Sequence, residues 1–323
     1  MTYRANRSEA EDLAELVDIN VAFAGRMACP AKRSEHGKGI ADLTATFTVL
    51  DHIEKEYRVG LFAQGGSYET TVRFSNSAMQ NDAKRDAHGF AMKLHGVPMD
   101  SAPVDEDGRR VQDFILLDCP TFVMGDLAQY IPFNRAFLDA KLTLRGKLDM
   151  ALLLLKNPKR ILPLLRLALI RANAPLSASY WSTTPYRLGD HVVKYKVFPI
   201  KPQHPLPRIR GEDGRRDALR RHLASAPGLF SFGVLIQTNP AKQPIDAPEV
   251  DWEENGASFI ALAEIYIPQD QPVEAPEDVE NALAFSPGHS AREHFPLGAI
   301  NRARVAIYAA ASRTRQQAAQ REK

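Results

Sequence analysis

TVRFSNSAMQNDAKRDAHGFAMKL, from Thr71 to Leu94, holds two strands and the loop between them. The first strand, 71–74, carries Arg73 between apolar neighbours. A polar, charged loop follows. The second strand, 89–94, alternates apolar and polar residues with the period of a pleated strand. This stretch therefore predicts a pair of neighbouring strands in which an arginine shares one strand with buried side chains.

Further strands and a few helices are predicted on both sides of this stretch. Alternating or continuous apolar runs indicate strands at 41–50, 114–117, 180–199, 230–238 and 259–267. Gly189-Asp190 divides the run at 180–199 into a hairpin. Apolar faces at helical spacing predict helices at 8–23, 213–223 and 298–320, the first capped by Ser8. The chain is therefore predicted to combine several strands with a few helices.

The region 126–175 differs in texture from the rest and is predicted to be helical. Its centre, MALLLLKNPKRILPLLRLALIR, is strongly apolar but carries basic residues and two prolines, so we expect two amphipathic helices with a break near Pro158. One interpretation is that these helices pack over a sheet. The other is an apolar, basic-rimmed surface, with Lys156, Lys159 and Arg160 on its rim, that meets lipid or a long-chain substrate.

Composition excludes several classes of protein. The 323 residues have a formal net charge of only +2, so no overall positive field attracts nucleic acid. The two cysteines, Cys29 and Cys119, form neither a disulfide framework nor a CxxC pair. The N-terminus has no signal-peptide core, and no apolar run is long enough to span a membrane. We therefore expect a soluble, cytoplasmic protein.

Two further motifs flank the strands. Before them stands Arg33-x-x-His36-x-Lys38-Gly39, and near the C-terminus Asn301-Arg302-Ala303-Arg304-Val305-Ala306-Ile307-Tyr308 puts Arg304 and Tyr308 one helical turn apart. A positive charge one turn before a tyrosine favours the phenolate form. Arg313 and Arg315 follow on the same helix.

In this order, the three motifs resemble the haem catalases. The family reads roughly RxxHAKG, then VRFS…RDxRGFAxK, then an arginine and a tyrosine four residues apart with two arginines beyond. The run Phe114–Phe122 also resembles the family's FFIRDPxxF. The resemblance covers about residues 30–125, 177–200 and 298–315, and is nearest to the short bacterial catalase-related haem proteins. It implies an α+β fold: an antiparallel barrel of about eight strands, wrapped by helices, with haem b between the barrel and the C-terminal helix.

The resemblance also implies roles for individual residues. His36 would be the distal acid–base, since imidazole can take a proton from one peroxide oxygen and return it to the other. Ser75 would orient the His36 ring, Tyr308 would ligate the iron as phenolate, and Arg304 would stabilise that phenolate. Three arginines would pair with the haem propionates: Arg33, Arg73 and Arg315.

Two positions depart from the family pattern. The distal asparagine expected shortly before Phe114 is missing, and Gln112 is the candidate to supply an amide in its place. Glu35 stands before His36, where catalases carry valine and allene oxide synthases threonine. Losing the asparagine weakens the case for fast hydrogen peroxide dismutation.

The resemblance implies a single catalase-like haem domain over 1–323 with a helical insert at about 126–175. It would be a haem peroxidase that cleaves the O–O bond of hydrogen peroxide or organic hydroperoxides, with weak catalase activity. It would require an electron donor and form a homo-oligomer, with peripheral lipid contact an open possibility. Two alternatives remain: a fatty-acid hydroperoxide isomerase resembling allene oxide synthase, with 126–175 as substrate channel, and a haem-binding protein without turnover. Because 148–170 is apolar and basic-rimmed, we expect bulky hydroperoxides to be preferred over hydrogen peroxide.

Overall fold

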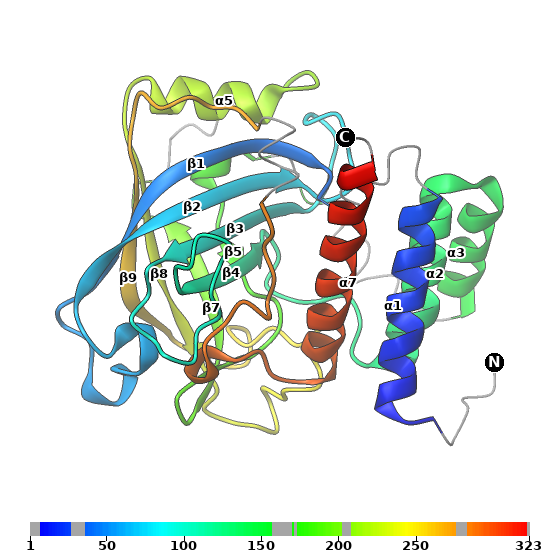
Figure 1. Ribbon diagram of the computed structural model, residues 1–323, viewed down its shortest axis with the longest axis horizontal. Helices are drawn as coiled ribbons and strands as arrows, with labels where there is room; N and C mark the ends of the chain where they lie inside the picture. Colours follow the sequence, from blue (N-terminus) through cyan, green and yellow to red (C-terminus); the bar gives the residue numbers. More distant parts are fainter. Residues whose placement is uncertain are drawn as a thin grey trace.

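The computed structural model describes residues 7–26, 36–156, 170, 173–201, 208–275 and 283–321, and the strands in this part form one antiparallel sheet (Figure 1). The strands are β1 (Lys38–Val49), β2 (Gly66–Asn76), β3 (His88–His95), β4 (Val111–Leu117), β5 (Tyr180–Trp181), β6 (Tyr186–Leu188), β7 (His191–Pro199), β8 (Gly228–Ile236) and β9 (Phe259–Ile267). All the predicted strands are present, and β1 and β2 are longer than predicted.

The sheet closes on itself as a barrel. Neighbours follow the order β1, β2, β3, β4, β5, β7, β8, β9 and back to β1, so eight strands form the ring and β6 pairs outside it with β7. Closure passes through β5, which pairs with β4 at Leu117–Trp181 and with β7 at Tyr180–Val197 and Trp181–Lys196. The predicted antiparallel barrel of about eight strands is confirmed.

Aromatic side chains fill the interior of the barrel. In β1, Leu43, Ala45, Phe47 and Val49 are buried at every second position, because alternate residues of a strand point to opposite faces of the sheet. The ring centroid of Phe232 lies 5.0 Å from that of Phe47 and 4.8 Å from that of Phe114. The interior is therefore a packed core, and a ligand has to bind outside it.

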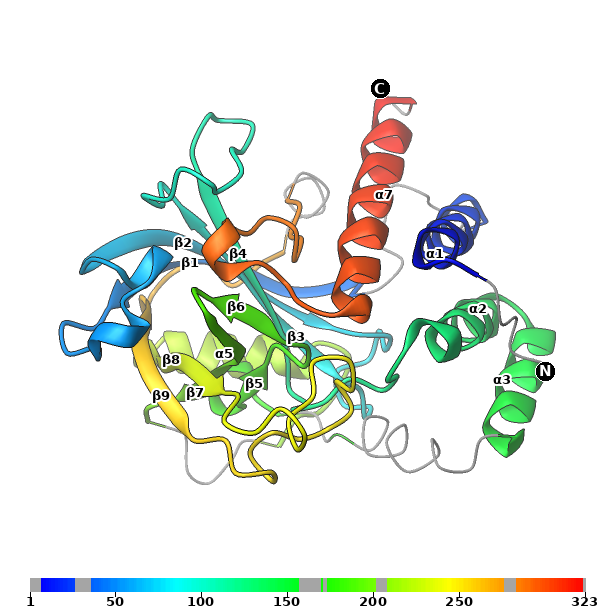
Figure 2. The same ribbon diagram turned by 90° about the horizontal axis from the view of Figure 1, so that it is seen from below.

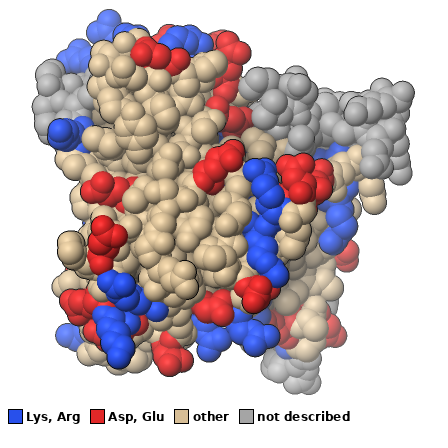
Figure 3. Space-filling model, turned by 60° about the vertical axis from the view of Figure 1, so that its left-hand side comes forward, with Lys and Arg blue, Asp and Glu red and all other residues tan. Residues whose placement is uncertain are grey.

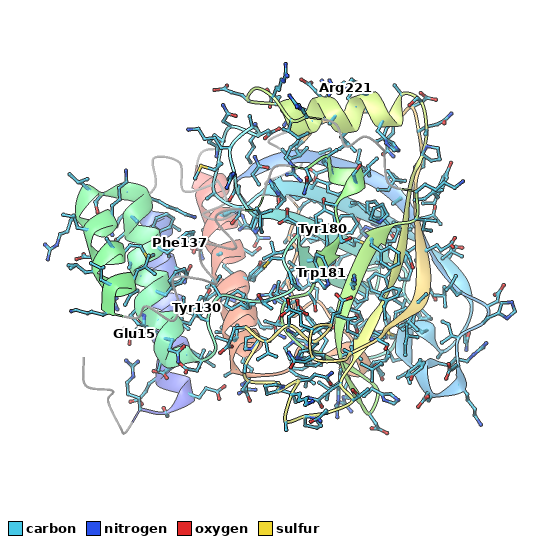
Figure 4. The ribbon with its side chains drawn as sticks, turned by 180° about the vertical axis from the view of Figure 1, so that it is seen from behind. Glu15, Tyr130, Phe137, Tyr180, Trp181 and Arg221 are labelled. Carbon is cyan, nitrogen blue, oxygen red and sulfur yellow. The ribbon has the colours of Figure 1, made fainter. Side chains whose placement is uncertain are left out.

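The helices form a layer beside the barrel, with one exception. The helices α7 (Ala299–Arg321), α1 (Glu9–Gly25), α2 (Leu127–Leu142) and α3 (Leu144–Lys156) stand one behind another on the same side of the barrel, while α5 (Gly214–Leu223) lies across the strands elsewhere (Figures 1 and 2). A second core joins α1, α2 and α7 through Leu16, Ile131 and Ile300. Figure 4 shows Tyr130 and Phe137 in this layer, apart from Tyr180 and Trp181 in the barrel.

The helices at the two ends of the chain agree with the prediction, but the region 126–175 differs in detail. Ser8 caps α1 through a capping box with Glu11. Within the described residues a break falls at Thr143, which is extended (φ −137°, ψ 150°), and the predicted break near Pro158 lies outside the described residues. Residues 157–169, including Lys159 and Arg160, lie outside the described residues; 173 and 174 are not helical, and Pro175 begins the short 3-10 helix Pro175–Ser177.

Charged residues of both signs are interspersed on the surface. On the face drawn in Figure 3, Lys and Arg alternate with Asp and Glu and form no single-sign track. Within the described residues, the helices are all too short or too polar to cross a bilayer.

Candidate functional site

A pocket lies between the outer face of β2–β4 and the helices α7 and α1. It contains about 750 Å³ of space that no atom fills, its open mouth included. Its polar lining brings together residues from four separate parts of the chain, and its remaining lining is mostly apolar. The lining residues are Asn20, His36, Arg73, Ser75, Gly89, Phe90, Ala91, Ile115, Leu116, Phe285, Ile307, Tyr308, Ala311 and Arg315.

His36 is fixed at this pocket by bonds from both its ring and its backbone. Its Nδ1 lies 2.9 Å from Ser75 Oγ, and its backbone N–H donates to Ser77 O at 3.0 Å. Its φ is +53°, a left-handed conformation that is costly for a residue with a side chain. These bonds hold the residue in that conformation. Ser75 therefore engages the Nδ1 atom of the ring.

Gly89 makes room for the His36 ring. It lies in β3 opposite Ser75, and a Cβ atom at this position would come within 2.6 Å of Ser75 Oγ and 2.8 Å of His36 Nδ1. Both distances are too short for any side chain. The sequence motif contained this glycine, but only the strand register shows that it faces the histidine.

Two of the three predicted propionate-binding arginines line the pocket. Arg73 is 3 % exposed, donates from Nη2 to His36 O at 2.8 Å, and lies 3.9 Å through Nε from Asp42 Oδ1. Arg315 reaches the same pocket from α7. Arg33 and Glu35 lie outside the described residues.

Tyr308 lines the pocket from α7, and Arg304 is buried behind it. Arg304 Nη1 donates to Thr184 Oγ1 at 2.6 Å and to Asn301 Oδ1 at 3.0 Å. Burial alone lowers the pKa of the guanidinium, but the neighbouring Tyr186 and Tyr308 side chains outweigh it and the pKa of Arg304 is raised. Arg304 therefore stays cationic, anchored to the barrel and in contact with the tyrosine.

Gln112 does not line the pocket. It is 1 % exposed, its Nε2 donates to Ser290 Oγ and Asp113 O at 3.0 Å, and its Oε1 accepts from Ala291 N at 2.9 Å. Its amide ties the 290–291 segment to β4. The position differs from the prediction because strand register sets which face of β4 each residue occupies: Ile115, three residues on, points to the pocket.

An amide that the sequence did not single out reaches the pocket from α1. Asn20 Nδ2 donates to Leu16 O at 2.8 Å and to Asn134 Oδ1 at 3.0 Å, and the residue is 6 % exposed. The signal was present, since Asn20 interrupts the apolar face of this helix four residues after Leu16. Its proximity to Tyr308 could not be predicted, because it depends on how α1 packs on α7.

No protein-family model matches the chain, and no curated protein matches it in sequence. Solved structures do match: a bacterial catalase (TM-score 0.71, 17 % identity), a fungal catalase (0.66, 16 %) and catalase A from Saccharomyces cerevisiae (0.61, 17 %). Each match covers 91 % of this chain.

These catalases are longer than the chain. It spans 59 %, 61 % and 63 % of their respective lengths, so the match covers somewhat less than two thirds of each. The low identity limits the likeness to architecture. This chain is therefore a protein of the catalase-like fold.

Proposed function

We propose that the chain is a haem b-dependent peroxidase, built as one catalase-like haem domain, that reduces hydrogen peroxide or organic hydroperoxides and has weak catalase activity. The observation that carries this proposal is the convergence of His36, Ser75, Arg73, Arg315 and Tyr308 on one pocket. An imidazole, a phenol and two guanidiniums among apolar side chains are a donor set that suits a flat apolar ring system with an iron and two carboxylates. Gly89 makes the room that the His36 ring occupies next to Ser75 at this pocket.

Each residue has a task that follows from its contacts. When bound, haem would supply the iron at which the O–O bond is cleaved. Tyr308 would hold the iron, with the cationic Arg304 stabilising the phenolate. Arg73 and Arg315 would bind carboxylates, a task proposed for Arg33 as well.

His36 would carry the proton. Its ring would take a proton from one peroxide oxygen and return it to the oxygen that leaves, while Ser75 holds Nδ1. A hydroperoxide ROOH, two electrons and two protons give ROH and water, so the reaction needs an electron donor. The electron donor, a homo-oligomeric state and a cytoplasmic location stay predictions.

The isomerase alternative finds no such support. The described residues of 126–156 do not line the pocket, and 157–169 lie outside the described residues. We therefore propose the peroxidase alone, and steady-state kinetics with hydrogen peroxide and an organic hydroperoxide will measure the substrate preference.

Haem binding tests the ligand assignment. We expect the purified chain to bind haem, and Tyr308→Phe to lose haem or to change its high-spin spectrum. Tyr186→Phe is the matched control, since Tyr186 also lies against Arg304 but does not line the pocket. Full haem occupancy with an unaltered Soret band in Tyr308→Phe would overturn the assignment.

Peroxide turnover tests the acid–base assignment. His36→Ala should keep haem and lose roughly 10²- to 10⁴-fold in peroxide consumption, because the histidine moves protons and does not bind the iron. The exposed His52 provides the control, and His52→Ala should behave as wild type. Turnover within a few-fold of wild type in His36→Ala would show that His36 is structural.

A further inference from the structure

The outermost helix of the molecule, α3, exposes a continuous stripe of leucines. Leu144 is 75 % exposed, Leu148 60 %, Leu152 52 % and Leu155 72 %. Their spacing of four, four and three residues puts them on one face of the helix. Single exposed leucines are ordinary, but four in register on one helix form the kind of patch that marks an interaction site.

The stripe is not needed to hold α3 in the fold. The helix packs on α2 with its other face, through Met150 and Leu153. Gly146 lets the two helices approach closely, since a Cβ atom there would lie 2.3 Å from the backbone carbon of Asp139. In Figures 1 and 2, α3 stands at the far side of the helical layer from the barrel. The leucines therefore face away from the protein.

Basic side chains flank the stripe on both sides. At 3.6 residues per turn, Lys147 lies roughly 60° to one side of Leu144, while Arg145 and Lys156 lie roughly 100° to 120° to the other. All three are exposed, and Asp149 is the one acidic residue of this helix. An apolar stripe with basic residues on both sides is complementary to a lipid bilayer that has an apolar interior and an anionic surface.

We propose that α3 binds an anionic lipid bilayer surface, lying in the plane of the interface. The leucines enter the acyl boundary, and Arg145, Lys147 and Lys156 contact the lipid headgroups. The proposal concerns a surface distant from the pocket and is independent of haem binding, so it stands or falls separately from the peroxidase assignment.

Vesicle binding by the full chain tests this proposal. In co-sedimentation, wild type should bind phosphatidylcholine vesicles that contain phosphatidylserine, bind pure phosphatidylcholine weakly, and lose binding as salt is raised. Leu148→Glu with Leu152→Glu should abolish binding. Arg145→Gln with Lys147→Gln should weaken binding to anionic vesicles roughly tenfold or more, because each basic residue near such a surface contributes about 1 kcal/mol.

Controls distinguish loss of the leucine stripe from an added negative charge elsewhere and from loss of folding. Val104 is 57 % exposed in the loop before β4, so Val104→Glu introduces the same charge at an equally exposed apolar residue and should leave vesicle binding unchanged. Circular dichroism and thermal unfolding should be unchanged in all the variants, since the substituted side chains are exposed.

Three results would overturn the proposal. The first is equal binding of wild type to anionic and neutral vesicles, or binding to neither. The second is that wild type forms a dimer in solution, that Leu148→Glu makes it monomeric, and that wild type does not bind vesicles. The stripe would then be an interface between two copies of the chain. The third is a stability loss in the leucine variants without vesicle binding, which would mean that the chain's own residues cover the stripe.

Discussion

The position of His36 depends on a residue that has no side chain. Gly89 lies opposite Ser75 in the strand register, and the His36 ring occupies the space that a Cβ atom would fill. The ring, the hydroxyl and the glycine therefore act as one unit, and changing the smallest of the three displaces the other two.

Gly89→Ala should reduce peroxide consumption roughly 10²-fold while the barrel and haem binding persist, because a misplacement of about 1 Å in a reacting group has an effect of this size. The measurement is steady-state turnover together with the haem spectrum. Gly25→Ala is the control, since a Cβ atom at Gly25 would meet nothing within 4 Å. Turnover of Gly89→Ala within a few-fold of wild type would mean that the His36 geometry is unimportant.

Single residues show what sequence can and cannot predict about the site. The resemblance implied the pairing of His36 with Ser75, and the sequence pattern at 298–320 predicted the C-terminal helix that carries Tyr308. The positions of Gln112 and Asn20 were not predicted, because their surroundings depend on register and on helix packing. A sequence motif predicts local structure, whereas the direction in which a side chain points depends on strand pairing and packing with residues far away in the sequence.

At the scale of elements, a buried arginine joins α5 to the strand that carries Ser75. Arg215 has no solvent exposure; its Nη1 donates to Asn76 Oδ1 at 2.7 Å and Ser75 O at 3.2 Å, and its Nε donates to Asn173 O at 3.1 Å. Loss of the guanidinium leaves these buried oxygens without a donor, and each unpaired group is costly.

Arg215→Met should therefore lower the free energy of unfolding by roughly 3 kcal/mol or more. Urea denaturation measures the change. Arg221 lies in the last turn of the same helix and is exposed (Figure 4), so Arg221→Met should change stability by less than about 0.5 kcal/mol. Equal effects of the two substitutions would show that Arg215 does not anchor α5.

Hydrophobic periodicity did not predict where the helices at 126–156 divide. The predicted helical character holds for the described part of the region, but the division at Thr143 was not predicted, because the sequence has no proline there. The hydroxyl of Thr143 accepts from Gly146 N at 2.9 Å and so starts α3, a local bond that hydrophobic periodicity does not report. Where the leucines point was likewise decided by packing on α2.

At the scale of the whole molecule, His294 fastens the segment before α7 to the barrel. Its Nε2 accepts from Leu61 N at 2.9 Å, and its Nδ1 lies 3.1 Å from Tyr195 Oη. Burial lowers the pKa of His294 to about 4. The neutral form is therefore the one that fits the folded protein.

Stability should consequently fall with acid. The unfolded chain binds the His294 proton at its ordinary pKa near 6.5, so the contribution is complete above that pH and is lost as the pH falls toward 4. Between about pH 7.5 and about pH 4.5 the loss from this group is roughly 2 to 3 kcal/mol.

Urea unfolding at the two pH values measures this loss. His294→Gln removes the titrating group, so its free energy of unfolding should depend on pH less than that of wild type by that amount. A pH dependence identical to wild type would show that His294 does not couple protonation to folding.

The ring of strands has one weak joint. β1 and β2 share eleven residue pairs, whereas β4 meets β5 at one. The barrel is held closed on this side by the two residues of β5, which pair with β4 and β7. Stress, heat or denaturant should open it there first, and the amides of Tyr180 and Trp181 should exchange with deuterium before those of β2. The pairing of β4 with β5 should also form late in folding, because more than sixty residues separate Leu117 from Trp181.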